Sequence, residues 1–154
     1  MKIRTMLLTL AAMFATAVGC FAADVNMGTW KVNASKSQNL PSDEKNITIA
    51  ITAAGDSMKV TFDGIDDKGK PTHDEWTGKF DGKDYPVTGF ADIDTLAYKP
   101  INGRTLAVTV KKGGKTVETD RIVYSADGKT RTVTETRTNA NGTKTKDTVV
   151  FDRQ

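Results

Sequence analysis

The sequence has little of what a catalytic or metal-binding protein usually needs. Its 154 residues include one cysteine and one histidine. The single cysteine, Cys20, excludes an intrachain disulfide, and a single histidine leaves a zinc site short of its usual nitrogen and sulfur ligands. The chain also has no Gly-x-Ser-x-Gly nucleophile motif and no glycine-rich phosphate loop. We therefore expect no enzymatic activity, no cofactor and no metal site.

The one histidine leaves a narrow alternative open. His73 and Glu75 are two residues apart, so they share one side of a strand, whereas Asp74 points to the other side. An enzyme would need His73, Glu75 and an arginine to converge in an interior cavity. The acidic residues around His73 lack the spacing of an EF-hand calcium loop and alternate with lysines, which favours a solvated hairpin turn. These residues are Asp63, Asp66, Asp67, Asp74 and Glu75.

Long apolar runs are absent outside the first 23 residues. Lys2 and Arg4 precede an apolar stretch at residues 6–18, which is short for a membrane span, and small residues follow it. We predict a secretory signal segment at residues 1–23 and a single domain at residues 24–154, exported to the periplasm or the medium. Cys20 is a lipidation candidate, because residues 17–20 resemble a bacterial lipobox with alanine in place of leucine. Lipidation would anchor the protein to the outer membrane, whereas cleavage after residue 22 or 23 would remove Cys20.

The chain also lacks a strong excess of charge of one sign. Without Lys2 and Arg4, 20 basic residues face 19 acidic ones. A nearly neutral domain argues against nucleic acid as the main partner. The oligomeric state is left open by these features.

Most of the sequence after residue 45 follows the two-residue period of β-strands. Apolar residues alternate with polar ones, as in residues 47–51 and 58–62. In residues 130–138, threonines alternate with Arg131, Val133, Glu135 and Arg137 on the opposite face. Further strands are expected at residues 75–80, 85–87, 93–98, 104–111, 115–124, 129–138 and 143–151.

Turn dipeptides separate these segments. From residue 102 onward, Asn-Gly, Gly-Gly and Asp-Gly pairs recur every 11 to 14 residues, which fits a strand plus a tight hairpin turn. A soluble protein with so many strands must protect its sheet edges, and closure into a barrel removes them. We predict an all-β fold, an antiparallel up-and-down barrel of about eight to ten strands. An open sandwich is the alternative.

The first expected strand is Gly28-Thr29-Trp30-Lys31-Val32-Asn33. Its glycine permits a close backbone approach, and its indole can plug one end of a barrel. This segment, residues 81–87 and residues 127–130 together resemble the calycin superfamily, in particular small secreted bacterial lipocalin-like proteins. The resemblance implies that Gly28, Trp30 and Arg153 close the barrel, with the Arg153 guanidinium packed on the indole.

Three departures from the family limit what the resemblance implies. Residues 34–45 are too few for the two-helix lid of a fatty-acid-binding protein; we expect a loop there with a helical turn capped at Ser42. No helix follows the last strand, which ends near Gln154. The Arg-x-Tyr motif that grips a carboxylate is not reproduced, since Phe151 stands near the expected tyrosine.

The expected barrel either holds a small apolar or amphipathic ligand in its lumen or is filled by its own side chains. A filled barrel would act through its surface, as an enzyme inhibitor or an envelope interaction protein. An arginine that points inward could anchor an acidic head group, although the outer face is the expected place for Arg121, Arg131 and Arg137. The lumen candidates are Ile49, Met58, Val60, Phe62, Trp76, Phe80, Tyr85, Leu106, Val108, Arg121 and Arg131.

Overall fold

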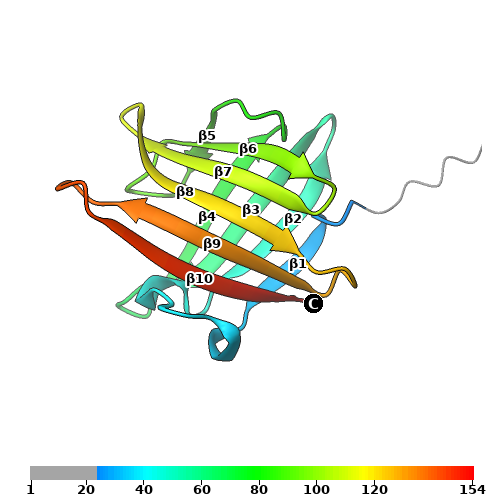
Figure 1. Ribbon diagram of the computed structural model, residues 1–154, viewed down its shortest axis with the longest axis horizontal. Coiled ribbons are helices and arrows are strands. Elements are labelled where there is room, and N and C mark those ends of the chain that lie inside the picture. Colours follow the sequence, from blue (N-terminus) through cyan, green and yellow to red (C-terminus); the bar gives the residue numbers. More distant parts are fainter. Residues whose placement is uncertain (1–23) are drawn as a thin grey trace, which may run out of the picture.

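The computed structural model describes residues 24–154, which form a closed barrel of ten antiparallel strands (Figure 1). The predicted barrel is thus confirmed, and the open sandwich is wrong. The expected signal segment and Cys20 lie outside the described residues. The strands are β1 (Gly28–Val32), β2 (Thr48–Ala54), β3 (Ser57–Ile65), β4 (Pro71–Gly78), β5 (Tyr85–Thr88), β6 (Thr95–Asn102), β7 (Thr105–Lys112), β8 (Lys115–Tyr124), β9 (Thr130–Thr138) and β10 (Lys144–Arg153).

Each strand pairs with its neighbours in the sequence, and β1 closes the barrel between β2 and β10. Trp30 is the centre of this closure, because it pairs with Ile49 on one side and with Arg153 on the other. Antiparallel partners face the same side of a sheet, so these pairs bring the indole and the last basic residue together. We call this end of the barrel, where β1 begins and β10 ends, the base.

Local sequence explains where the strands turn. Gly128 and Gly142 have φ angles of 67° and 82°, a left-handed conformation that glycine adopts without steric cost. Both lie in hairpins that the Asp-Gly and Asn-Gly pairs predicted. In contrast, β5 has only two paired residues with each neighbour, and Pro86 cannot donate to the ladder. The wall is therefore weakest at β5.

The segment between β1 and β2 contains two short 3-10 turns, η1 (Ala34–Lys36) and η2 (Ser42–Glu44). Asn33 caps η1 through its side chain, which accepts a hydrogen bond from the Lys36 backbone N–H at 3.2 Å. Ser42 lies inside η2 rather than capping it, and Pro41 occupies the cap position. The expectation of a Ser42 cap is therefore wrong. Residues 24–154 contain no helix with the length and hydropathy of a membrane span.

The core is a continuous cluster of side chains on the inner faces of the strands. Trp76 is fully buried; its Nε1–H donates to the Leu96 carbonyl at 3.1 Å, and its ring lies 4.7 Å from the Tyr98 ring centroid. Phe80 stacks on Tyr98 at 5.1 Å, and Tyr85 meets the Trp76 ring edge-on at 5.9 Å. This aromatic cluster stiffens the wall beside the short strand β5.

Candidate functional site in the barrel lumen

The barrel encloses a cavity of about 470 Å³. It opens toward the end of the barrel that carries η2, since Glu44, Asp66 of the β3–β4 hairpin and Phe90 of the β5–β6 loop also line it. The lumen is therefore hollow, and its wall combines apolar side chains with charged ones from β8 and β9. We call the acids among these, Glu118, Asp120 and Glu135, the acidic band. The apolar part includes Ile49, Phe62, Leu96, Val108, Val133 and Phe151.

Arg131 lies in this cavity with only 3% of its surface exposed. Its guanidinium carbon is 5.2 Å from the centroid of the Phe151 ring. Its Nε and Nη1 atoms are buried and have no hydrogen-bond partner among residues 24–154. Arginine keeps its charge in proteins, and a buried charge without a partner is costly. The lumen thus contains a cationic side chain with two nitrogens that donate no hydrogen bond within residues 24–154.

Arg137 lies nearer the η2 end and is fully engaged. Its Nε is 2.6 Å from Glu118, its Nη1 is 3.1 Å from Asp147, and its Nη2 contacts Glu135 at 2.7 Å. The same Nη2 also contacts Glu44 of η2 at 2.5 Å, so the turn is tied to the barrel wall. One guanidinium therefore holds four carboxylates at the mouth of the cavity.

Burial shifts the pKa values of two of the acids in this cavity, and neighbouring carboxylates add to the effect. Burial, followed by the charge of Glu44, raises the pKa of Glu135 to about 8, against the opposing effect of Arg137. Burial, followed by the charges of Glu118 and Glu135, raises the pKa of Asp120 well above its ordinary value. Burial acts to lower the pKa of the Arg137 guanidinium, but the surrounding carboxylates outweigh it and raise that pKa. Burial therefore favours the protonated forms of Glu135 and Asp120.

The structure brings part of the predicted lumen set together around the cavity. Arg131 and three apolar residues line it directly, and the others, apart from Arg121, are core or base residues. Those lining it are Ile49, Phe62, Val108 and Arg131. Those buried in the core are Val60, Trp76 and Leu106, and Tyr85 is half-buried against Trp76.

Arg121 lies on the outer face, so its assignment to the lumen is wrong. It is exposed and pairs with Ala107 on β7 and Thr134 on β9. Its neighbours Asp120 and Ile122 face inward, and the alternation of a strand then turns Arg121 outward. The expectation of an outer location is wrong for Arg131 and Arg137, which share the inward face of β9 with Val133.

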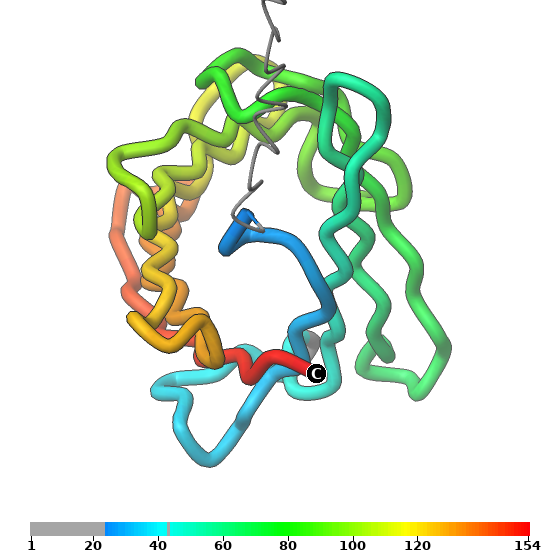
Figure 2. Tube along the Cα trace, turned by 90° about the vertical axis from the view of Figure 1, so that its right-hand side faces the viewer, coloured from blue at the N-terminus to red at the C-terminus, as the bar shows by residue number. Residues whose placement is uncertain are grey.

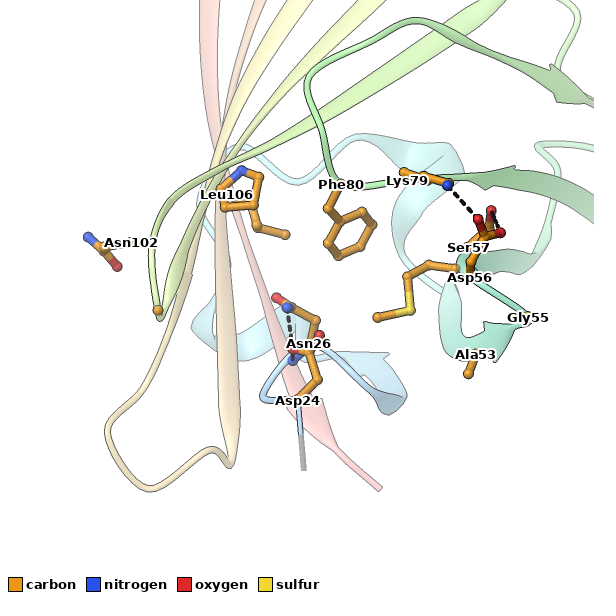
Figure 3. A pocket seen from close by; sticks show the side chains of 13 residues that line it. Asp24, Asn26, Ala53, Gly55, Asp56, Ser57, Lys79, Phe80, Asn102 and Leu106 are labelled. Atoms are coloured by element: carbon orange, nitrogen blue, oxygen red, sulfur yellow. Dashed lines mark hydrogen bonds and ion pairs between the residues drawn. The ribbon is translucent and has the colours of Figure 1, made fainter. Parts of the chain in front are cut away.

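A second hollow of about 490 Å³ lies at the base (Figure 3). Met58, Phe80 and Leu106 line it, so these three lumen candidates face the base rather than the Arg131 cavity. Lys79 and Asp56 form an ion pair at 2.5 Å beside it. Figure 2 shows residues 24–27, the blue segment just before β1, lying inside the ring of strands.

The base is closed by an arginine whose three side-chain nitrogens each donate a hydrogen bond. The Arg153 guanidinium carbon lies 4.2 Å from the centroid of the Trp30 ring, the arrangement implied by the family resemblance. Gly28, at φ 114°, passes so close that a Cβ there would lie 2.7 Å from Nη1 of Arg153. The Arg153 donors reach the backbone carbonyls of Gly128 at 2.6 Å, Met27 at 2.5 Å and Val25 at 2.7 Å.

His73 lies on the outside of β4. Its Nδ1 is 2.6 Å from Asp63 and its Nε2 is 3.0 Å from Glu75, and its side chain is 57% exposed. Hydrogen bonds to Asp63 and then Glu75 raise the pKa of His73. The structure therefore brings His73 and Glu75 together as expected, but away from the lumen where the enzyme alternative needed them. Residues 24–154 contain no group of three or more His, Cys, Asp or Glu side chains placed to hold a metal ion.

The sequence analysis did not predict that the acids of the acidic band face the lumen. Glu118 and Asp120 are two residues apart on β8, and Glu135 faces them from β9. Their spacing beside Ile122 and Val133, which belong to apolar inner faces, is the signal that places them inside. Because charged residues are usually exposed, the sequence indicated a solvent-facing position for them instead.

Fold and cavity together define a calycin-like β-barrel with a polar lumen. No protein-family model and no curated protein matches the chain. Among solved structures, it is similar to the REP1-NXSQ fatty acid transporter, with 12% identity, a TM-score of 0.59, and coverage of 83% of this chain and 95% of the other. It is also similar to the fatty acid binding protein of Schistosoma mansoni in complex with arachidonic acid, with 18% identity, a TM-score of 0.56, and coverage of 84% and 96%. At these identities the likeness is one of fold.

Proposed function

We propose that this protein binds a small amphipathic molecule in its lumen and holds the molecule's acidic head group on Arg131. The observation that carries the proposal is that two donors of Arg131 are buried beside an interior cavity without a partner among the described residues. A carboxylate or similar anion would pair with both the charge and the donors. Charge-assisted hydrogen bonds of this kind are about twice as strong as neutral ones.

The remainder of the cavity suits the apolar part of such a ligand. Its volume of about 470 Å³ lies within the usual range of small-molecule sites. Phe62 and Phe151 offer aromatic surface, and Phe151 also supports the guanidinium that would receive the head group. The two similar solved structures described above are named for fatty acids, which is consistent with a ligand of this class.

The alternative is a barrel that acts only through its surface. A packed interior would favour that alternative, because a surface-acting module has no use for an internal space. The cavity and the unpaired Arg131 both favour the lumenal ligand. If this position only had to fill the interior, an apolar side chain of the same volume would be more stable than a buried arginine.

Calorimetric titration with decanoic and dodecanoic acid tests the proposal. We expect Arg131→Met to weaken binding by about 10-fold to 100-fold, which corresponds to one charged hydrogen bond. Arg121→Met removes an arginine from the outer face of the adjacent strand and should leave the affinity unchanged. Absence of binding to the unaltered protein, or an equal loss in Arg121→Met, would contradict the proposal.

We also propose that the protein works outside the cytoplasm as a secreted bacterial lipocalin-like protein. Residues 1–23 support this through their charge and apolar pattern. The intact mass of protein recovered from its natural envelope or medium is the test. Retention of residues 1–23 would overturn export by a cleaved leader, and a lipid adduct on Cys20 would identify a lipoprotein.

A further inference from the structure

The inward faces of β8 and β9 carry polar groups at two different depths. Nearest the base, Tyr124 pairs with Arg131, and the next inward pair is Ile122 with Val133. Beyond this apolar pair, Asp120 pairs with Glu135. The cavity wall therefore runs from a cationic donor near the base, across an apolar step, to acidic acceptors nearer the mouth.

Within the acidic band, Asp120 forms a side-chain hydrogen bond with Glu118 but leaves its other oxygen unused among residues 24–154. Glu118, Glu135 and Asp147 all contact Arg137, as does Glu44. Oδ1 of Asp120 is buried and has no hydrogen-bond partner within residues 24–154, although Asp120 lines the same cavity as Arg131. The cavity thus has an unused acceptor as well as an unused donor.

We propose that the natural ligand is bifunctional, with an acidic group on Arg131 and a hydroxyl or ammonium group that donates a hydrogen bond to Asp120. This inference rests on the proposed function and adds a second recognition group to it. Asp120 is four residue steps along β8 from Tyr124, which pairs with Arg131, so the two ligand groups would lie about 13 Å apart.

The cost of an unpaired buried group supports this assignment. A ligand with a plain hydrocarbon tail would satisfy Arg131 but leave Oδ1 of Asp120 unpaired beside apolar atoms. A hydroxyl suits a protonated carboxyl, because that group both donates and accepts. An ammonium would favour the ionised carboxylate, in a band where acids already outnumber arginines. Sites built to bind a donor discriminate strongly against analogues that lack it.

Three acids of equal chain length test the inference by calorimetry: decanoic, ω-hydroxydecanoic and ω-aminodecanoic acid. We expect at least one of the two substituted acids to bind the unaltered protein about 5-fold or more tighter than decanoic acid. A preference for the hydroxy acid identifies a neutral donor, and a preference for the amino acid identifies a cationic one. Equal or weaker binding of both overturns the inference while leaving the proposed function in place.

Two substitutions assign the preference to Asp120. Asp120→Leu should abolish it, whereas Asp120→Asn, which keeps a carbonyl acceptor and nearly the same shape, should retain a preference for the hydroxy acid and lose one for the amino acid. Glu75→Gln, on the outer side of β4, is the matched control and should change neither preference.

A preference that survives in a folded Asp120→Leu, or is lost equally in Glu75→Gln, overturns the assignment to Asp120. If none of the three acids binds the unaltered protein, both the proposed function and this inference fail.

Discussion

Arg153 at the base and Arg131 in the lumen are the same side chain in opposite situations. Each guanidinium lies over an aromatic ring, at 4.2 Å from Trp30 and 5.2 Å from Phe151. Arg153 donates to three backbone carbonyls, whereas two nitrogen atoms of Arg131 have no partner in residues 24–154. A charge whose nitrogens all donate hydrogen bonds stabilises the fold, and a buried charge with unpaired nitrogens weakens it unless a ligand binds. Hydrogen-bond satisfaction therefore separates the closure of the barrel from its candidate binding site.

The largest expected effect is at the base. Arg153→Met should lower the free energy of unfolding by about 3–5 kcal/mol, because three carbonyls lose a charged donor and Trp30 loses its cation. Urea denaturation of the unliganded protein measures this change. Arg121→Met is the control for loss of an exposed arginine and should change stability by less than about 0.5 kcal/mol. Equal effects of the two substitutions would contradict a structural role for Arg153.

The opposite sign is expected in the lumen. Arg131→Met should raise the free energy of unfolding of the unliganded protein by about 1–3 kcal/mol, because it replaces an unpaired buried charge with an apolar side chain of similar length. The same urea denaturation measures it. A variant that is more stable yet binds acids weakly would exhibit the trade-off expected of a binding residue. A destabilised Arg131→Met would instead assign Arg131 to the structural class of Arg153.

The strands could be predicted because the chain alternates so regularly. Residues 115–124 were expected as a strand and form β8 with those bounds. The expected strand at residues 93–98 stopped short of Pro100, yet β6 continues to Asn102. The register shifts between Pro100 and Asn102, and a bulge tolerates proline because the ladder there does not need its missing N–H.

The polar lumen was harder to predict because it depends on which face of a strand turns inward. Arg131, Val133, Glu135 and Arg137 were recognised as one face of a strand, but three of the four are charged. Charged residues are rarely buried, so composition favoured an outward direction. Val133 pairs with Ile122 and with Val149 in the closed barrel, and this register fixes the inward direction. The position of Val133 between charged residues was the one hint in the sequence, and the register across three strands turns that hint into a direction.

The smallest expected effect is on the pH dependence of stability, and it compares an acid inside the barrel with one on its outer face. The pKa of Glu135 is raised to about 8, so between its ordinary value of 4.5 and about 8 the folded state holds more protons than the unfolded state. Stability should therefore fall as the pH rises from about 5 to 8, by about 1 kcal/mol or more from this group. Asp152 on the outer face behaves oppositely, because Asn33 and then Lys36 lower its pKa, and its contribution is lost only as the pH falls through that lowered value.

Urea denaturation across pH 5 to 8 measures the slope. Glu135→Gln should flatten it, and a residual decline should remain, since the pKa values of Asp120 and His73 are raised and act in the same direction. Asp152→Asn should leave the slope unchanged, because Asp152 is ionised in both states throughout this range. If the unaltered protein instead gained stability from pH 5 to 8, the interior acids would be ionised in the folded state. The acidic band would then be a structural ion cluster held by Arg137, and the unpaired atoms of Arg131 and Asp120 would still distinguish the lumen from the base within residues 24–154.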